Sequence, residues 1–241
     1  MDSLPQELID RIIDNLPLRR ILRYSLVAKR WRRRTQQRAF EKIKFFSEDD
    51  VNRWCTNVPQ DSDGLSSYVQ RITFEEIASW NDPTAPGRVL KNFSSLIKLR
   101  VSESAIPNEL PAQMSRGEFG KGITILHILF PLCTLAPIVS MILSLPNLKM
   151  LRIAGYAIKS GEPLSTHPVA LQREPLDLLE IHGDVCGLGE ALVRSRLTSR
   201  HLFLEVRTSS IKQLMIHSSE TMVELNLNGV WFLKFSGDQK Q

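Results

Sequence analysis

The first apolar positions of the chain lie three or four residues apart, which is the spacing of an amphipathic helix. These positions are Leu8, Ile9, Ile12, Ile13 and Leu16. Ser3 is suited to cap this helix, and Pro5 is suited to its first turn, where a missing N–H costs nothing. Pro17 is expected to end the helix.

A second apolar group follows among basic residues, and it predicts one or two further short helices. Its members are Leu18, Ile21, Leu22, Leu26, Val27 and Trp31. A unit of this size cannot bury so much apolar surface within itself, and it contains no Cys or His for a disulfide or metal. We assign Ile13, Leu16 and Leu22 to its core. The surplus apolar surface is expected to dock another protein.

Beyond residue 64, a six-residue pattern recurs: apolar, two variable, apolar, one variable, apolar. Its copies begin at Val69, Leu96, Ile123, Leu148, Leu176 and Met222, with a weaker copy at Ser199. The middle apolar positions are 72, 99, 126, 151, 179, 202 and 225, so the steps are 27, 27, 25, 28, 23 and 23 residues. The last two apolar positions of each copy alternate, as on one face of a short strand.

Helices are expected between these strands, at residues 88–93, 136–145, 188–196 and 209–217. Each strand and helix pair cannot bury its own apolar side, so neighbouring units must stack. The spacing and the strand pattern are typical of leucine-rich repeats. The copies are irregular, and we expect a degenerate leucine-rich-repeat-like α/β solenoid. An ordinary α/β sheet domain is the alternative.

The expected fold class is therefore α/β overall, with an all-α helical unit at the N-terminus. We divide the chain into the helical unit at 1–46, a connecting helix and linker at 47–64, and the repeat domain at 65–241. The connecting helix is expected to start near Ser47, with Val51 and Trp54 holding it to the core. Trp54 is predicted to be a packing residue between the two parts.

The N-terminal unit resembles an F-box. The resemblance rests on Leu4-Pro5 with Glu7-Leu8, on Ile12-Ile13 with Leu16, and on Ser25-Leu26-Val27 with Trp31. It implies that the unit binds a Skp-type adaptor, and through it a cullin, in an SCF ubiquitin ligase. The resemblance implies an adaptor-facing set of Leu4, Pro5, Leu8, Ile9, Ile12, Leu26, Val27 and Trp31. With divergent repeats behind it, the chain is similar to F-box proteins that are abundant in mushroom-forming fungi.

By the same resemblance, the chain would be a non-catalytic receptor whose repeats hold a substrate protein. Variable strand positions supply the candidate substrate-binding residues, with cations on the earlier strands and carboxylates on the later ones. The candidates are Arg71, Lys98, Arg100, Arg152, Glu180 and Glu205. An F-box scaffold without substrate turnover is an alternative.

The net charge of +5 is concentrated in the helical unit. Residues 1–46 hold 12 Lys and Arg against 5 Asp and Glu, whereas the other 195 residues hold 19 against 21. A basic run from Lys29 to Arg34, with Arg38 and Lys42, could bind nucleic acid. We favour a solvated helix face, or one that meets an acidic adaptor. A basic nucleic-acid-associated protein is the alternative function.

Residues 123–148 contain no charged side chain, and their length equals that of a membrane span. They also contain Pro131, Pro137 and Pro146, and they fall in phase with the repeats. We expect a strand and a buried helix here, and no membrane partner. A membrane protein is the alternative if the interpretation of the pattern as repeats is wrong.

The sequence contains no pattern typical of an enzyme or a cofactor site. Its five histidines show no zinc spacing, and Gly117–Gly122 lacks the glycine gap and the Ser/Thr of a phosphate-binding loop. We expect no cofactor, no metal and no catalysis. Three widely spaced cysteines and a charged start indicate a reducing compartment without a signal peptide, hence a cytoplasmic and/or nuclear protein.

Overall fold

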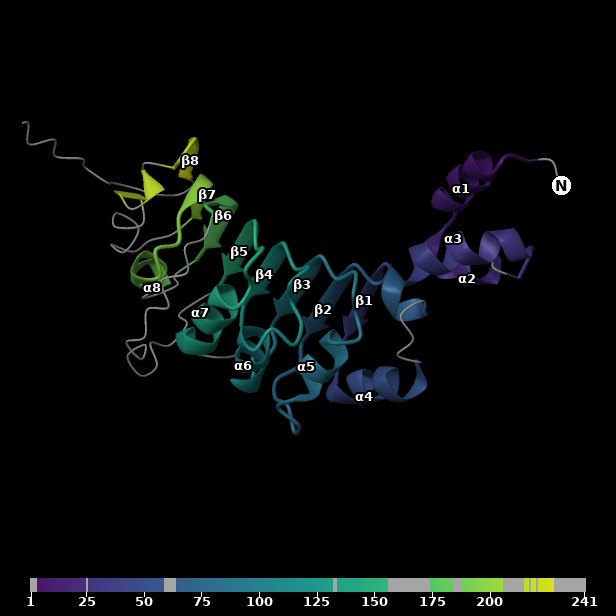
Figure 1. The fold of residues 1–241 in the computed structure, drawn as a ribbon, viewed down its shortest axis with the longest axis horizontal. Helices are drawn as coiled ribbons and strands as arrows, with labels where there is room; N and C mark the ends of the chain where they lie inside the picture. The colour runs from purple at the N-terminus through teal and green to yellow at the C-terminus, as the bar shows by residue number, and fades with distance from the viewer. Residues whose placement is uncertain are drawn as a thin grey trace, which may run out of the picture.

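The computed structural model describes residues 4–24, 26–58, 64–131, 134–155, 174–183, 188–205, 215–216, 218–219 and 221–227. A helical unit at the N-terminus leads into a parallel sheet that is flanked by helices (Figure 1). The helical unit consists of α1 (Gln6–Asp14), the 3₁₀ helix η1 (Leu18–Arg20), α2 (Ile21–Tyr24) and α3 (Lys29–Phe40). Pro5 is the N-cap of α1, and Ser3 lies outside the described residues.

The sheet has eight parallel strands, and each strand pairs with the next one in the sequence. The strands are β1 (Lys42–Phe45), β2 (Arg71–Glu75), β3 (Lys98–Ser102), β4 (Ile125–Leu129), β5 (Met150–Ala154), β6 (Leu176–His182), β7 (Ser199–Glu205) and β8 (Glu224–Leu227). The middle apolar positions of the sequence pattern all meet in register. They are Ile72, Leu99, Leu126, Leu151, Leu179, Leu202 and Leu225.

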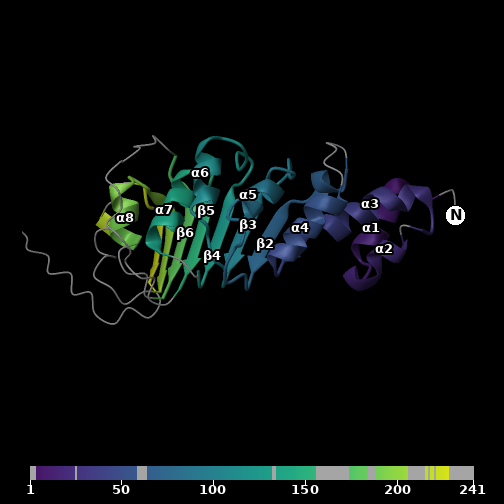
Figure 2. The same cartoon turned by 90° about the horizontal axis from the view of Figure 1, so that it is seen from below.

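The helices behind the sheet all lie on one side of it, so its other face carries no helix within the described ranges (Figures 1 and 2). They are α4 (Glu48–Asn57), α5 (Ala85–Leu90), α6 (Glu109–Ser115), α7 (Leu135–Leu143) and α8 (Leu188–Arg194), and the 3₁₀ helix η2 (Leu65–Tyr68) precedes β2. Successive helices contact each other. The strand leucines and the helix interiors form one continuous apolar core.

The hydrogen-bond ladder extends past the carboxyl ends of the strands. After β2 to β6, the residue that follows the strand donates its N–H to the carbonyl oxygen of the last residue of the next strand, as in Glu76 to Ser102 at 3.0 Å and Glu103 to Leu129 at 2.8 Å. Glu76, Glu103 and Phe130 adopt φ of 62°, 50° and 50° at this position, in the left-handed region. The same left-handed turn therefore follows β2, β3 and β4.

The seven predicted strands are confirmed, whereas β1, α6 and the 3₁₀ helix η2 were not predicted. Strand β1 completes the sheet and has the same pattern, at Phe40, Ile43 and Phe45. Of the helix expected at 209–217, the structure describes only 215–216, which are helical.

The boundary predicted at residue 64 is wrong for the sheet. Strand β1 belongs to it, and Phe45 and Val51 are buried in the same core as the later strands. Their apolar side chains cover the first layer of the sheet, which would otherwise face water. The sheet therefore begins at Lys42, directly after α3.

Aromatic packing joins the helical unit to the sheet, as predicted for Trp54. The Trp54 ring lies 6.2 Å from Phe40 of α3, 6.3 Å from Phe45 of β1 and 5.6 Å from Phe93, between ring centroids. Helix α3 also contacts η2. These contacts fix the end of α3 against the first layer of the sheet.

The uncharged run at 123–148 contains β4 and the nine-residue helix α7. Leu126, Ile138 and Ile142 are fully buried, so the run lacks charges because it crosses the core. Across the described stretches, no helix is both long and apolar enough to cross a membrane.

Gly183, which follows β6, gives a direct test of this left-handed turn. It adopts φ of +85°, and a Cβ there would lie 2.2 Å from the carbonyl oxygen of Gly155. We expect Gly183→Ala to lower the free energy of unfolding by more than about 2 kcal/mol, because a left-handed alanine and a backbone clash add.

Gly117→Ala is the matched control for this test. Gly117 has φ of +72°, but its nearest neighbour would be the flexible Lys121 side chain at 3.8 Å. In urea titrations of both variants, we expect Gly117→Ala to lower the free energy of unfolding by only about 1–2 kcal/mol. Equal losses for the two variants would contradict the described packing of Gly183 on Gly155.

Candidate functional site

Three isoleucines form the core of the helical unit. Ile9 and Ile13 of α1 and Ile21 of α2 are almost fully buried, with Leu16, Trp31 and Ala39 packed against them. Ile9 was expected to face an adaptor, and this expectation is wrong for the chain as it stands. Its side chain is 0 % exposed because α1 turns it toward α2 and α3.

Most other residues of the predicted adaptor-facing set are exposed. They are Leu4, Pro5, Leu8, Ile12, Leu26 and Val27. Leu26 is 81 % exposed and Leu8 is 44 % exposed. Trp31 is half-buried on the core, and Ser25 lies outside the described residues.

The exposed apolar surface is larger than predicted. Leu18 and Leu22, one turn apart on η1 and α2, are 58 % and 49 % exposed. Leu22 was assigned to the core, and this assignment is wrong, because Ile21 takes the inward position of this short helix. We call the exposed residues Leu4, Leu8, Ile12, Leu18, Leu22, Leu26 and Val27 the apolar face.

Two arginines of the basic run hold α3 against α1. Arg34 donates from Nε and Nη2 to the Asp14 carboxylate, at 3.0 and 2.6 Å. Arg38 donates to the carbonyl oxygens of Ile13 and Leu16, which close the end of α1. Such contacts satisfy carbonyls that a helix end leaves unpaired. This part of the basic run therefore has a structural role.

The six predicted substrate-binding residues all point to the helix-free face of the sheet. They are Arg71, Lys98, Arg100, Arg152, Glu180 and Glu205, and they alternate with buried strand residues. Because the strands are parallel and in register, the face is positive around Lys98 and Arg100 on β3 and carries carboxylates on β6 and β7.

Most of these charges have a partner of opposite charge or an imidazole nearby. Arg71 Nη2 lies 3.4 Å from Glu41, and Arg152 Nε lies 3.4 Å from Glu180. His182 lies between two carboxylates, with Nε2 2.6 Å from Glu180 and Nδ1 2.8 Å from Glu205. Lys98 and Arg100 have no carboxylate within ion-pair distance among the residues that the structure describes.

His127 lies at the centre of the positive region. In the strand register, His127 of β4 lies opposite Arg100 of β3 on one side and opposite Arg152 of β5 on the other. Burial, followed by the charges of Lys98, Arg152 and Arg100, lowers the pKa of His127 from 6.5 to about 4, although Glu180 opposes the shift. Its imidazole is therefore neutral at physiological pH. Burial and the charges of Arg71, Arg100 and Arg152 also lower the pKa of Lys98.

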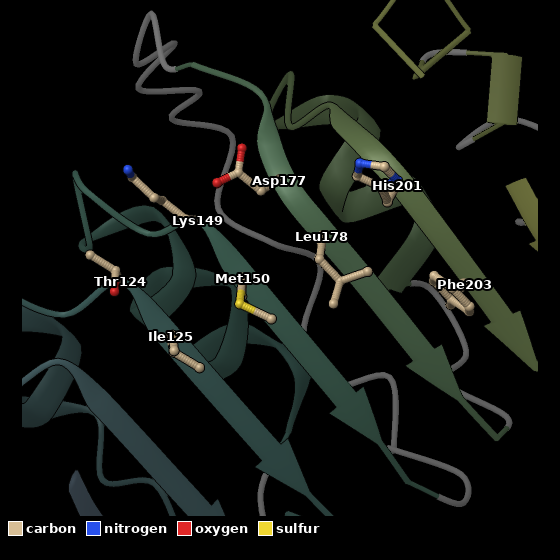
Figure 3. A pocket seen from close by; sticks show the side chains of 8 residues that line it. All are labelled: Thr124, Ile125, Lys149, Met150, Asp177, Leu178, His201 and Phe203. Atoms are coloured by element: carbon tan, nitrogen blue, oxygen red, sulfur yellow. The ribbon is translucent and has the colours of Figure 1, made fainter. Parts of the chain in front are cut away.

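A hollow of about 340 Å³ lies beside this region on the same face (Figure 3). Its floor consists of Ile125, Met150, Leu178 and Phe203, from four successive strands. Thr124, Lys149 and Asp177 lie toward the amino ends of the strands, and His201 lies on β7. The hollow therefore combines an apolar floor with a polar rim.

Sequence reasoning found the charges of this face but missed the hollow and His127. Both occupy the variable positions between the apolar residues of the repeated pattern. Aligning the seven copies and reading each variable column across strands would have shown Ile125, Met150 and Leu178 in one row.

The described residues offer little for catalysis or metal binding. Over the ranges given above, no group of three or more His, Cys, Asp and Glu could hold a metal ion. Gly117–Gly122 lies in the connection between α6 and β4, as predicted for an ordinary loop. The two surfaces that stand out, the apolar face and the helix-free sheet face, are suited to binding.

Comparison with known families agrees with the N-terminal geometry. Residues 1–42 match the F-box domain, which covers α1 to α3. F-box domains bind Skp-type adaptors within SCF ubiquitin ligases, where F-box proteins are typically non-catalytic subunits. No curated protein matches the chain.

Neighbouring residues Leu8 and Ile9 should respond differently to truncation. Ile9→Ala removes a fully buried side chain and should cost about 2–5 kcal/mol. Leu8→Ala removes an exposed one and should change stability by less than about 0.5 kcal/mol. Hydrogen exchange of the α1 amides will measure both effects. Equal protection in the two variants would contradict the described orientation of α1.

The protonation of His127 should also be measurable. The unfolded chain takes up a proton near pH 6.5 that the folded chain takes up only near pH 4. We therefore expect the contribution of His127 to the free energy of unfolding to be fully present above pH 6.5. This contribution should be lost as the pH falls from 6.5 to 4. NMR titration of the His127 Cε1 proton should give a midpoint near 4.

Lys98→Gln with Arg100→Gln is the companion variant for this titration. Removing two of the cations that lower the pKa should move the midpoint upward. A wild-type midpoint near 6.5, unchanged in the variant, would refute the described surroundings of His127.

Proposed function

We propose that this chain is the substrate-recognition subunit of an SCF-type ubiquitin ligase. Its apolar face would bind a Skp-type adaptor, and through it a cullin. The helix-free sheet face would hold a substrate protein. The observation that carries the proposal is the coincidence of the F-box match at 1–42 with exposed leucines that the helical unit cannot bury.

Energetics favour a protein partner for the apolar face. Burying one exposed leucine contributes about 1.5–3 kcal/mol. The unit has three isoleucines at its core, whereas its apolar face has seven residues that are at least 38 % exposed. A partner surface that covers them would therefore stabilise the helical unit as well as bind it.

The sheet domain would be a degenerate leucine-rich-repeat-like solenoid. Three observations support this proposal: the strictly sequential parallel order, the register of the middle apolar positions, and the left-handed turn after β2, β3, β4 and β6. In solenoids, the variable strand positions present an extended binding surface. Here this surface is the helix-free face, with its charge gradient and hollow.

The alternative of a nucleic-acid-associated protein has less support. Arg34 and Arg38 are engaged within the helical unit, and the positive part of the sheet face adjoins carboxylates that repel phosphate. A cytoplasmic and/or nuclear location follows from the proposed function, and the free thiol of Cys55 is in keeping with it.

Co-expression with a Skp-type adaptor tests the proposal. We expect the two chains to co-elute at equal stoichiometry in size-exclusion chromatography at about 1 M salt, because an apolar interface tolerates salt whereas phosphate contacts weaken steeply. Leu8→Asp with Leu26→Asp should abolish co-elution by placing carboxylates in the interface. Trp31 is unsuitable for this test, since it packs on the core.

Val223→Asp is the matched control, because Val223 is 76 % exposed but lies far from the helical unit, just before β8. It should leave co-elution unchanged. A wild-type chain that elutes without the adaptor would refute adaptor binding. A complex that forms but transfers no ubiquitin to any captured protein would indicate the F-box scaffold.

A further inference from the structure

The helix-free face contains a row of side chains whose character changes in order across six strands. The register aligns Lys98, Ile125, Met150, Leu178, His201 and Glu224, from β3 to β8. The row is thus basic at one end, apolar in the middle and acidic at the other end. Its middle is the floor of the hollow.

The basic end of the row has cationic side chains that could bind an anion. Arg100 lies two residues beyond Lys98 on the same strand and the same face. Its Nε is buried and has no hydrogen-bond partner in the described part of the chain. Because neither Lys98 nor Arg100 has a carboxylate within ion-pair distance in the described ranges, an anionic ligand would add charge-assisted hydrogen bonds to them. Nearby Arg152 is partly neutralised by Glu180 at 3.4 Å.

The acidic end of the row has the opposite preference. Glu224 is exposed and lies 3.2 Å from Nδ1 of His201. Further along the same face, β6 and β7 carry Glu180 and Glu205. A ligand with negative charge along its whole length would be attracted by Lys98 and repelled here, so the face favours a ligand whose two ends differ in charge.

We propose that this row binds an extended protein segment with an anionic side chain over Lys98 and Arg100, an apolar side chain in the hollow, and a cationic side chain near Glu224. This inference rests on the proposed function, because it names the class of substrate that the sheet face would recognise. The anionic group is a carboxylate or a phosphate, and both suit a lysine and arginine pair.

Sheet geometry sets the spacing of these three side chains. Neighbouring strands lie about 4.8 Å apart, so Met150 at the middle of the hollow is about 10 Å from Lys98, two strands away. An extended segment advances about 3.3 Å per residue. The anionic and apolar residues should therefore be about three residues apart, and the cationic residue should follow about four residues later.

Nucleic acid fits this row less well than protein. The hollow has an apolar floor of four side chains, and the carboxylates beyond it oppose a phosphate backbone. A single-stranded oligonucleotide is therefore included in the test as a competing class of ligand.

The experiment measures fluorescence anisotropy of labelled peptides with the full chain, at about 50 mM salt, where surface charges are weakly screened. The probe is Glu-Ser-Thr-Leu-Ser-Thr-Ser-Lys, synthesised in both chain directions. Three further peptides exchange the Glu and Lys, replace Leu with Ser, or replace Glu with phosphoserine. We expect exchange of the charges to weaken binding at least about tenfold in the preferred direction.

Variants of the chain test the site itself. Lys98→Glu with Arg100→Glu should weaken binding of the probe peptide at least about tenfold. This variant should bind the charge-exchanged peptide more tightly than the probe. Lys98→Gln with Arg100→Gln should weaken it without that reversal, and it serves if the Glu variant fails to fold. Arg53→Glu with Lys121→Glu makes the same change in net charge at two exposed residues outside the face, and binding should stay within about twofold.

Each outcome has a defined meaning. Tighter binding of the phosphoserine peptide assigns a phosphate to the basic end, and equal or weaker binding assigns a carboxylate. No binding of any peptide, equal binding of the charge-exchanged peptide, or tighter binding of the oligonucleotide would overturn the inference. Adaptor co-elution is measured separately, so a chain that captures the adaptor but ignores the peptides refutes this inference alone.

Discussion

The register between neighbouring parallel strands is the constraint on which the rest of the sheet depends. A strand four to seven residues long cannot bury its leucines unless the next strand places its own leucine at the same level. Ile72, Leu99 and Leu126 meet in this way, and the N–H groups after each strand continue the ladder. A slip of one residue would turn every buried side chain outward, so the burial of the core and the pairing of the backbone enforce each other.

The outward face follows from the same constraint. Once the leucines are aligned, the residues between them are aligned as well, which brings Lys98, Ile125 and Met150 into one row although they are 27 and 25 residues apart in the sequence. Charge and apolar character thus vary along the sheet as they vary from one copy of the pattern to the next. The binding properties of the face are therefore a consequence of how the core is built.

The sequence predicted the sheet better than the surfaces. Alternating apolar positions locate a strand without knowledge of its neighbours, so the seven copies were found, whereas β1 was missed because its first apolar residue, Phe40, is also the last residue of α3. Leu8 and Ile9 are consecutive apolar residues, and only their contact with α2 and α3 decides which one is buried. The hollow needed four strands in register, which is tertiary information.

The joint between the helical unit and the sheet is short and is held by backbone hydrogen bonds. Glu41 alone separates α3 from β1, and its carbonyl oxygen accepts the N–H groups of Gln70 and Arg71, both at 3.0 Å. The connecting residue thus already takes part in the backbone hydrogen bonding of the sheet. The adaptor would bind on one side of this joint and the substrate on the other. The distance between them would then increase by about 4.8 Å for each strand that separates the substrate from the joint. The position of the binding row along the sheet would then decide which lysines of a substrate come within reach of ubiquitin.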